Sequence, residues 1–387
     1  MKKWWIGAAL AAMCLSQSAR GQYPPGGGAL LPEPAPVAPS GGQDESGHKF
    51  MPGPLPGGAA PPGPDNTLAL PVDIPSAWGK GPTPESAAYL HLGAMALMRE
   101  RPGRTAVAED DGVTVLNTHN LDPEFQLGAR ATIGYLCDDA AIELTGFYLP
   151  EDTTTASIVS PGQLTLPFFH PPAGFQGARG VGLWAVADSA SINLQSSLGD
   201  VELNYRWWSR AFTSVEGIVG FRYVELQEQT NIAVADNVTG AGLSSLPVAA
   251  LEATYLARVH NHMLLPQVGF EWNYPIASWL NFALMAKVAA GADNIDQTTR
   301  LTNGEGLVGL QGRDNRWTWA GLYEVGAYFD LVTLEKMRLR AGYMGMGVVH
   351  VGEALQQVNY NLAAPGGARD SGSIYYHGPV LEMQFLF

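Results

Sequence analysis

The chain has 387 residues, a formal net charge of −14 and a pI of about 4.9. Phosphate backbones repel an acidic protein, so this composition argues against a nucleic-acid partner. Only 15% of the residues are charged, well below the usual fraction of about a quarter. Glycine and aromatic residues are frequent at the same time, and this balance favours a protein whose outer wall faces lipid.

The first 21 residues have the pattern of a secretory signal peptide. Two lysines precede an apolar run at 4–15, and a stretch of small residues follows at 18–21. The apolar run is too short to cross a membrane as a helix. We therefore expect export and cleavage after Gly21. Cleavage leaves Cys137 as the one cysteine, which excludes an internal disulfide and a cysteine-based metal site.

Residues 22–84 are rich in proline and glycine. Sixteen of the 28 prolines lie in this segment. Such a composition cannot bury enough apolar surface to fold, so it predicts a disordered periplasmic linker before a domain at 85–387. A contact between residues 23–84 and the cell wall is the alternative to a simple tether, although no specific motif supports it.

Apolar and polar side chains alternate repeatedly after residue 85. The clearest runs are at 124–137, 201–208, 268–274, 280–288 and 337–343. A β-strand turns successive side chains to opposite faces, so each run predicts one apolar face and one mixed polar face. Many runs reach the roughly 9–11 residues that a tilted strand needs to cross the hydrocarbon layer. Strands of soluble domains usually have about 5–6.

The connections between these runs alternate between short and long. Short ones fall at 138–139, 210–211, 275–278 and 330–336, and long ones at 101–121, 151–195, 229–262, 294–314 and 348–374. Outer-membrane barrels have short periplasmic turns and long external loops. We therefore predict an all-β fold, a closed antiparallel transmembrane β-barrel of about ten strands in the bacterial outer membrane. The count becomes twelve if 229–262 contains a further pair of strands.

The last stretch, 380–387, is expected to be the strand that closes the barrel. Leu381, Met383, Phe385 and Phe387 alternate with more polar positions, and the partner is the first predicted strand at 87–100. Phe387 is the expected signal for the outer-membrane assembly machinery. That machinery and the lipid bilayer are therefore the expected partners.

Short motifs in these strands resemble those of a known family. Phe125, Gly128 and Arg130 resemble the early hairpin of the putative beta-barrel porin-7 family, which is common in planctomycetes. Residues 220–226 are similar to its G-x-R-Y-x-x-L strand. The chain departs from the family at His350, where Arg-Pro-Gly is more frequent. The resemblance covers the whole predicted barrel and implies an outer-membrane protein, but it implies no settled activity for particular residues.

Charged side chains on the polar strand faces are the candidate lumen-lining residues. They are Arg130, Glu143, Glu202, Arg206, Glu216, Arg222, Glu271, Lys287, Glu324, Arg338 and Arg340. A barrel of about ten strands is narrow, and buried charges must be paired or hydrated. The sequence therefore predicts a narrow mixed-charge lumen, which either serves a structural role with ion pairs or passes small solutes and ions in a porin-like manner.

Histidines in the long connections are the candidates for chemistry at the external rim. These are His119, His170, His260, His262 and His350. His260 and His262 could bind a metal side by side, but the sequence specifies no third ligand. We therefore expect no catalytic residue, no cofactor and no metal site. A protease- or lipase-like rim enzyme and a ligand-binding or adhesion role of the external loops are the alternatives.

Overall fold

The computed structural model describes residues 86–137, 140–177, 182–209, 212–236, 251–334 and 336–387. All of them belong to the second of two units of the chain, Asp73–Phe387. The signal peptide and linker predicted at 1–84 lie outside the described residues. Among the residues described, no helix has the length and apolarity that a membrane span requires.

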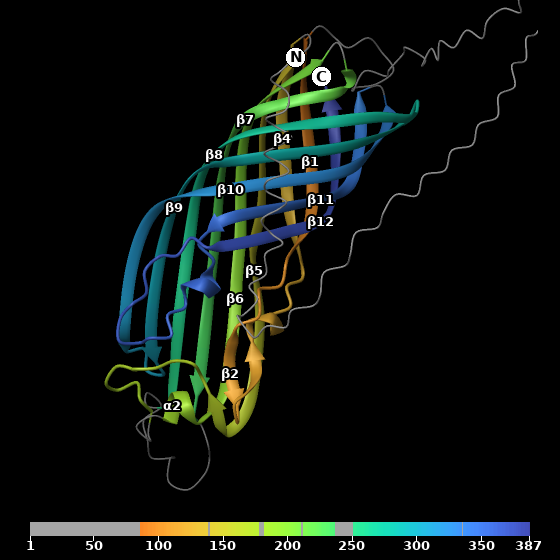
Figure 1. Ribbon diagram of the computed structural model, residues 1–387. Helices are drawn as coiled ribbons and strands as arrows, with labels where there is room; N and C mark the ends of the chain where they lie inside the picture. The colour runs from red at the N-terminus through yellow and green to blue at the C-terminus, as the bar shows by residue number, and fades with distance from the viewer. Residues whose placement is uncertain (1–85, 138–139, 178–181, 210–211, 237–250, 335) are drawn as a thin grey trace, which may run out of the picture. The chain divides into compact units, whose positions relative to one another are not determined.

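The described strands form an antiparallel sheet that closes into a barrel (Figure 1). Around the ring run β1 (Ser86–Arg99), β4 (Phe125–Cys137), β5 (Ala140–Thr165), β6 (Ala187–Ser209), β7 (Phe212–Ala235), β8 (Glu252–Ala277), β9 (Leu280–Asn303), β10 (Val308–Leu334), β11 (Met337–Val351) and β12 (Gly372–Leu386). β12 pairs with β1, where Leu386 lies opposite Tyr89. The all-β barrel of ten strands and its closure by the last strand are confirmed.

Two further strands complete the twelve-stranded sheet of the described residues. β2 (Ala106–Asp110) and β3 (Val113–Asn117) form a hairpin in the connection between β1 and β4. Its turn, Asp111–Gly112, has positive φ at both positions, 49° and 77°, which matches the tight hairpin turns that suit twisted strands. β2 also pairs with the end of β5. The extra strands therefore lie near 106–117. In 229–262, the described residues only continue β7 and begin β8.

Several connections predicted to be long are largely strand, and this prediction was wrong. Strands β5 to β10 contain 23 to 27 residues, whereas β1, β4, β11 and β12 contain 13 to 15. Residues 304–307 alone separate β9 from β10. The long strands reach beyond the short ones at the end of the barrel opposite Phe387 (Figure 1). On these extensions the outward face becomes polar, as at Gln227 and Asn231, and the inward face mixes polar and apolar residues, as at Thr230 and Ile232. The contrast between the faces that marks a strand in the sequence therefore fades while the strand continues.

An apolar band surrounds the outer wall. On β7, outward-facing Val219, Phe221 and Tyr223 are 43–61% exposed. Glu225 and Gln227 follow on the same face. The neighbouring strand β8 changes from apolar to polar at the matching height. Exposed apolar patches of this extent are not typical of a wall in water, whereas a lipid-facing barrel wall has such a band.

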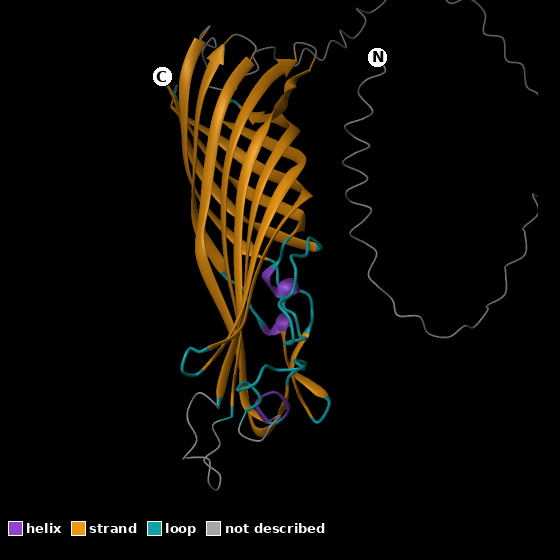
Figure 2. Ribbon diagram, turned by 90° about the vertical axis from the view of Figure 1, so that its left-hand side faces the viewer, coloured by secondary structure: helices purple, strands orange, loops and turns teal. Residues whose placement is uncertain are grey.

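Beyond the band, the strand extensions enclose an external lobe with its own apolar core. Its loops include a short helix, α2 (Gly182–Ala185), and two 3₁₀ turns, η1 (Thr118–Asn120) and η4 (Ala354–Gln357). Figure 2 shows these short helices and loops gathered beside the extended strands. Phe168 lies at the centre of the core, with its ring centroid 5.0–5.3 Å from those of Trp184, Tyr255 and Tyr360.

Candidate functional site: the barrel interior

All eleven candidate lumen residues are buried inside the ring, and each forms at least one ion pair. Their side chains are at most 14% exposed, and they are Arg130, Glu143, Glu202, Arg206, Glu216, Arg222, Glu271, Lys287, Glu324, Arg338 and Arg340. They project from nearly every strand of the ring because inward positions recur at every second residue. Their burial follows from this geometry.

Arg222 on β7 is the centre of a first cluster that crosses the interior. Its guanidinium is fully buried, and Nε lies 2.7 Å from Oδ2 of Asp200. It also pairs with Glu202 on β6 and with Glu324 on β10. Lys287 Nζ lies 2.9 Å from Oε2 of Glu202. Three carboxylates and two cations therefore connect β6 and β7 with β9 and β10 through the interior.

Arg206 and Arg340 form a second cluster, which is joined by one carboxylate. Arg206 Nε donates to Oε2 of Glu143 at 2.6 Å, and its Nη1 donates to Oε2 of Glu216 at 2.8 Å. Glu271 accepts from Arg206 Nη1 through Oε2 at 3.0 Å and from Arg340 Nη2 through Oε1 at 2.6 Å. This sharing satisfies most charges of the cluster without water.

Several partners of these charges were missed in the sequence. Asp330 pairs with Arg338 and Arg340, but the sequence analysis assigned it to a turn. Asp200 immediately precedes a predicted strand, and Glu382, a partner of Arg130, lies in the closing strand. Each keeps the period-two register of its strand, so extending two predicted strands by one residue would have found Asp200 and Asp330, and Glu382 already lies on the polar face of the closing strand.

A small polar cavity lies among the charges. Its volume is about 50 Å³, and its lining includes Tyr89, His91, Arg130, Glu143 and Arg206. A space of this size holds a few water molecules. It is too small for a solute such as a sugar or an amino acid.

A buried apolar layer lies farther along the strands, between the charged clusters and the external lobe. Its members come from most strands of the ring, and among them are Leu97, Leu226, Met263, Leu265, Leu322, Met344 and Met346. Each of these seven side chains is at most 2% exposed. These side chains pack against one another and narrow the interior at this level.

A polar layer fixes the last external connection over the mouth of the barrel. Arg99 Nε donates to Oε1 of Glu228 at 2.8 Å, and its Nη2 donates to Oε1 of Glu353 at 3.2 Å. Asn261 accepts from the backbone N–H of Gly352 at 2.7 Å and donates to its carbonyl at 2.9 Å. Burial raises the pKa of the Glu353 carboxyl. The loop before β12 is therefore held by buried polar contacts.

The five candidate rim histidines do not converge on one site. His119 lies in η1 with Nδ1 3.2 Å from the carbonyl of Pro102, and the His350 ring lies tilted against that of Trp319 with a centroid separation of 4.1 Å. His170 lies in the connection between β5 and β6. His260 and His262 are on the outward face of β8 and do not face the lumen.

The comparisons with known proteins concern the same part of the chain. The family model of putative beta barrel porin-7 matches residues 92–366. No curated protein matches the chain. Among solved structures, the outer membrane protease OmpT from Escherichia coli is similar at 9% identity and a TM-score of 0.45, over 78% of this chain and 97% of that chain. The toluene transporter TodX from P. putida is similar at 9% identity and a TM-score of 0.31, over 81% and 92%. The family match spans more than half of the sequence, and the chain belongs to the putative beta barrel porin-7 family.

Proposed function

We propose that this protein is a bacterial outer-membrane barrel with a closed interior, whose role is to anchor and display the packed external lobe. In this proposal the signal peptide exports the chain and the segment at 22–84 tethers it in the periplasm. The observation that carries the proposal is the filled interior, with ion-paired clusters followed by an apolar layer.

Two physical reasons favour a closed barrel interior over free diffusion of ions and solutes through it. A conducted ion needs a hydrated path, and a hydrophobic constriction opposes one by excluding water. Leu226, Met263 and Met346 supply such a constriction. Separating a buried ion pair such as that of Arg222 and Glu202 leaves an uncompensated charge, at a cost of about 3–5 kcal/mol. Thermal opening of both layers together is therefore rare.

Planar-bilayer recording tests this proposal. The mature protein is purified in detergent, and heat-modifiable migration on gels verifies that the barrel is folded. We expect no conductance steps at high salt, while a wide porin reconstituted in the same way supplies the positive control. Reproducible steps from the wild-type protein would overturn the closed-interior proposal.

A narrow ion path is the second candidate, and the polar cavity of about 50 Å³ favours it. If steps occur, Glu216→Gln and Glu271→Gln test their route, because both carboxylates line this cavity. Changed conductance or ion preference in these variants would assign conduction to the charged lumen. A matched Glu151→Gln change on exposed wall should leave the steps unaltered.

The proposal includes no catalytic activity. The external lobe instead offers a rigid surface for ligand binding or adhesion, because its loops pack on a common apolar core. A reproducible hydrolysis by the purified protein that is lost in His119→Ala would contradict this part of the proposal.

A further inference from the structure

Three potential metal ligands converge on the outer wall of the barrel, outside the interior described above. They are Glu225 on β7 and His260 and His262 on β8, and their ligand atoms all lie within 4.8 Å of one another. No other group of three such residues occurs in the described part of the chain. Glu225 is the third ligand that the sequence did not specify.

Strand geometry explains the convergence. His260 and His262 are two residues apart, so both project outward from β8. Glu225 lies directly opposite His262 in the register between β7 and β8. The cluster is therefore carried by two hydrogen-bonded strands, which limits its freedom more than a loop would.

Two observations indicate that the imidazoles are prepared for a ligand. Nε2 of His260 is buried and has no hydrogen-bond partner among the described residues, and a buried polar atom without a partner is costly. Nδ1 of His262 lies 3.0 Å from the hydroxyl of Tyr223. When Nδ1–H donates to that oxygen, Nε2 of His262 is left free to bind a metal, as in many protein metal sites.

The surroundings and height of the cluster suit a cation reached from water. Asp296 on β9 lies opposite His260, and its charge is balanced by an ion pair with Arg313. The one neighbouring cation on this face of β8, Arg258, is held by Gln229 through Nε at 2.7 Å. Glu225 is exposed and both histidines are partly exposed. Along β7, Glu225 is the first polar outward residue after Tyr223, so the cluster lies at the external boundary of the apolar band.

We propose that Glu225, His260 and His262 bind a divalent transition-metal ion of the zinc type at this boundary, with the remaining coordination position open to water or a ligand. Two imidazoles and one carboxylate form a ligand set that Zn²⁺ uses in proteins. Ligand atoms around a tetrahedral Zn²⁺ lie about 3.3 Å apart. Small side-chain rotations would bring the three ligand atoms, which lie within 4.8 Å of one another, to this spacing. This site is independent of whether the barrel conducts.

Metal titration of the folded mature barrel tests the proposal. The protein is stripped with a chelator, and Zn²⁺ affinity is measured by competition with a chromophoric chelator. We expect one tightly bound Zn²⁺ per chain. His260→Ala, His262→Ala and Glu225→Gln should each weaken binding by about tenfold or more, and Tyr223→Phe by about tenfold, because it removes the group that orients His262.

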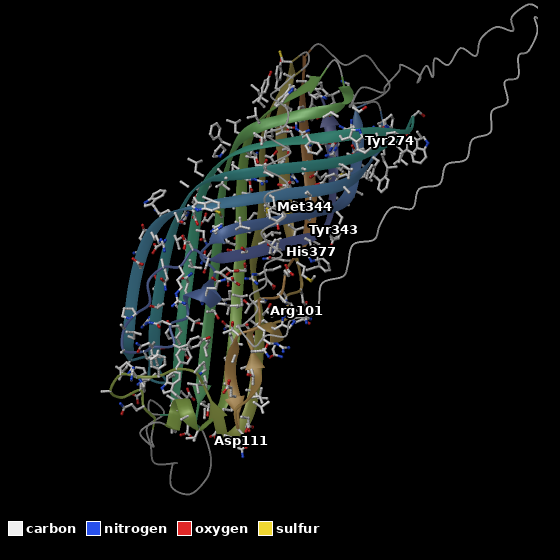
Figure 3. The ribbon with its side chains drawn as sticks, viewed as in Figure 1. Arg101, Asp111, Tyr274, Tyr343, Met344 and His377 are labelled. Atoms are coloured by element: carbon white, nitrogen blue, oxygen red, sulfur yellow. The ribbon has the colours of Figure 1, made fainter. Side chains whose placement is uncertain are left out.

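His377→Ala is the matched control. His377 also lies on the outer wall, and its Nδ1 is 2.6 Å from the hydroxyl of Tyr343, on the adjacent strand (Figure 3). His377 belongs to no cluster of three ligands in the described residues. Its loss should leave Zn²⁺ affinity unchanged. Heat-modifiable migration verifies folding of every variant. Wild-type affinity in the double variant His260→Ala/His262→Ala, or an equal loss in His377→Ala, would overturn the proposal.

Discussion

At the scale of single residues, Arg222 shows how a charge can be kept inside this barrel. Its guanidinium is fully buried and is surrounded by Asp200, Glu202 and Glu324. Asp200 and Glu202 lie on the adjacent strand β6 and Glu324 lies on β10, so the arginine cannot leave one partner without weakening the others. Pairing of this kind makes the interior specific, although a well-packed apolar replacement of the whole cluster could be as stable.

Truncating Arg222 alone should destabilise the folded barrel strongly. Arg222→Ala leaves three buried carboxylates short of a counter-charge, and we expect a loss of about 3–5 kcal/mol in the free energy of unfolding. Urea titration in detergent measures this loss. Arg313→Ala is the control, because the Arg313–Asp296 pair is exposed to water, and it should leave the midpoint almost unchanged. Equal midpoints for both variants would contradict the central role of Arg222.

Phe387 is the proposed signal for the outer-membrane assembly machinery, and this role can be tested. Its side chain is 68% exposed, so it contributes little to packing, yet its N–H donates to the carbonyl of Ala88 at 2.9 Å. Phe387→Asp keeps this backbone contact and removes the aromatic ring. We expect much less folded barrel in the outer membrane but normal refolding in detergent. Leu334→Asp, at another exposed strand end, should assemble normally. Wild-type levels of folded Phe387→Asp in the outer membrane would count against Phe387 as the assembly signal.

At the scale of elements, the external lobe depends on an aromatic cluster around Phe168. The neighbouring residue Phe169 lies outside this cluster, so the two phenylalanines provide a matched test. Phe168 is 6% exposed and packs on Trp184 and Tyr255, whereas Phe169 is 49% exposed. Phe168→Ala should cost about 3–5 kcal/mol within the lobe, as large-to-small core changes do.

Limited proteolysis reports on the stability of the lobe separately from that of the barrel. In Phe168→Ala, we expect faster cleavage in the connections at 166–186 and 352–371 and unchanged heat-modifiable migration of the barrel. Phe169→Ala should be cleaved like the wild-type protein. Equal cleavage of both variants would show that the aromatic cluster does not hold the lobe together.

The sequence predicts the membrane part of the elements better than the external part. Within the band, apolar and polar faces alternate, so strand identity, direction and inward charges such as Arg130 and Lys287 can be predicted. On the extensions, outward residues such as Gln227 and Asn231 are as polar as many inward ones, and the signal disappears. The triad of Glu225, His260 and His262 depends on the register between β7 and β8, which no local pattern specifies.

At the scale of the whole molecule, the apolar band fixes how the barrel sits in the bilayer. Val219 and Gln227 lie on the same outward face of β7, but only Val219 lies within the band. Val219→Arg should cost about 2–4 kcal/mol in lipid, as arginine does near the bilayer centre. Gln227→Arg should cost almost nothing, because its position is in water.

Refolding titrations in lipid vesicles measure this difference. The same two variants in detergent micelles supply the control, since micelles adapt their shape to a charged side chain better than a bilayer does. Similar costs for both variants in vesicles would contradict the assigned position of the band.

The unequal strand lengths also have a consequence for the order of folding. β1 and β12 share nine paired positions, whereas β6 and β7 share 21. Within the shorter seam, Pro379 lacks an N–H to donate. At Gly378, a Cβ would lie only 1.9 Å from the carbonyl oxygen of Ala96, so the strands approach too closely there for a larger residue. The seam joins the two most distant strands in sequence, so its loop-closure entropy is the largest in the barrel. It should form last, open first, and show the fastest amide hydrogen exchange in the ring.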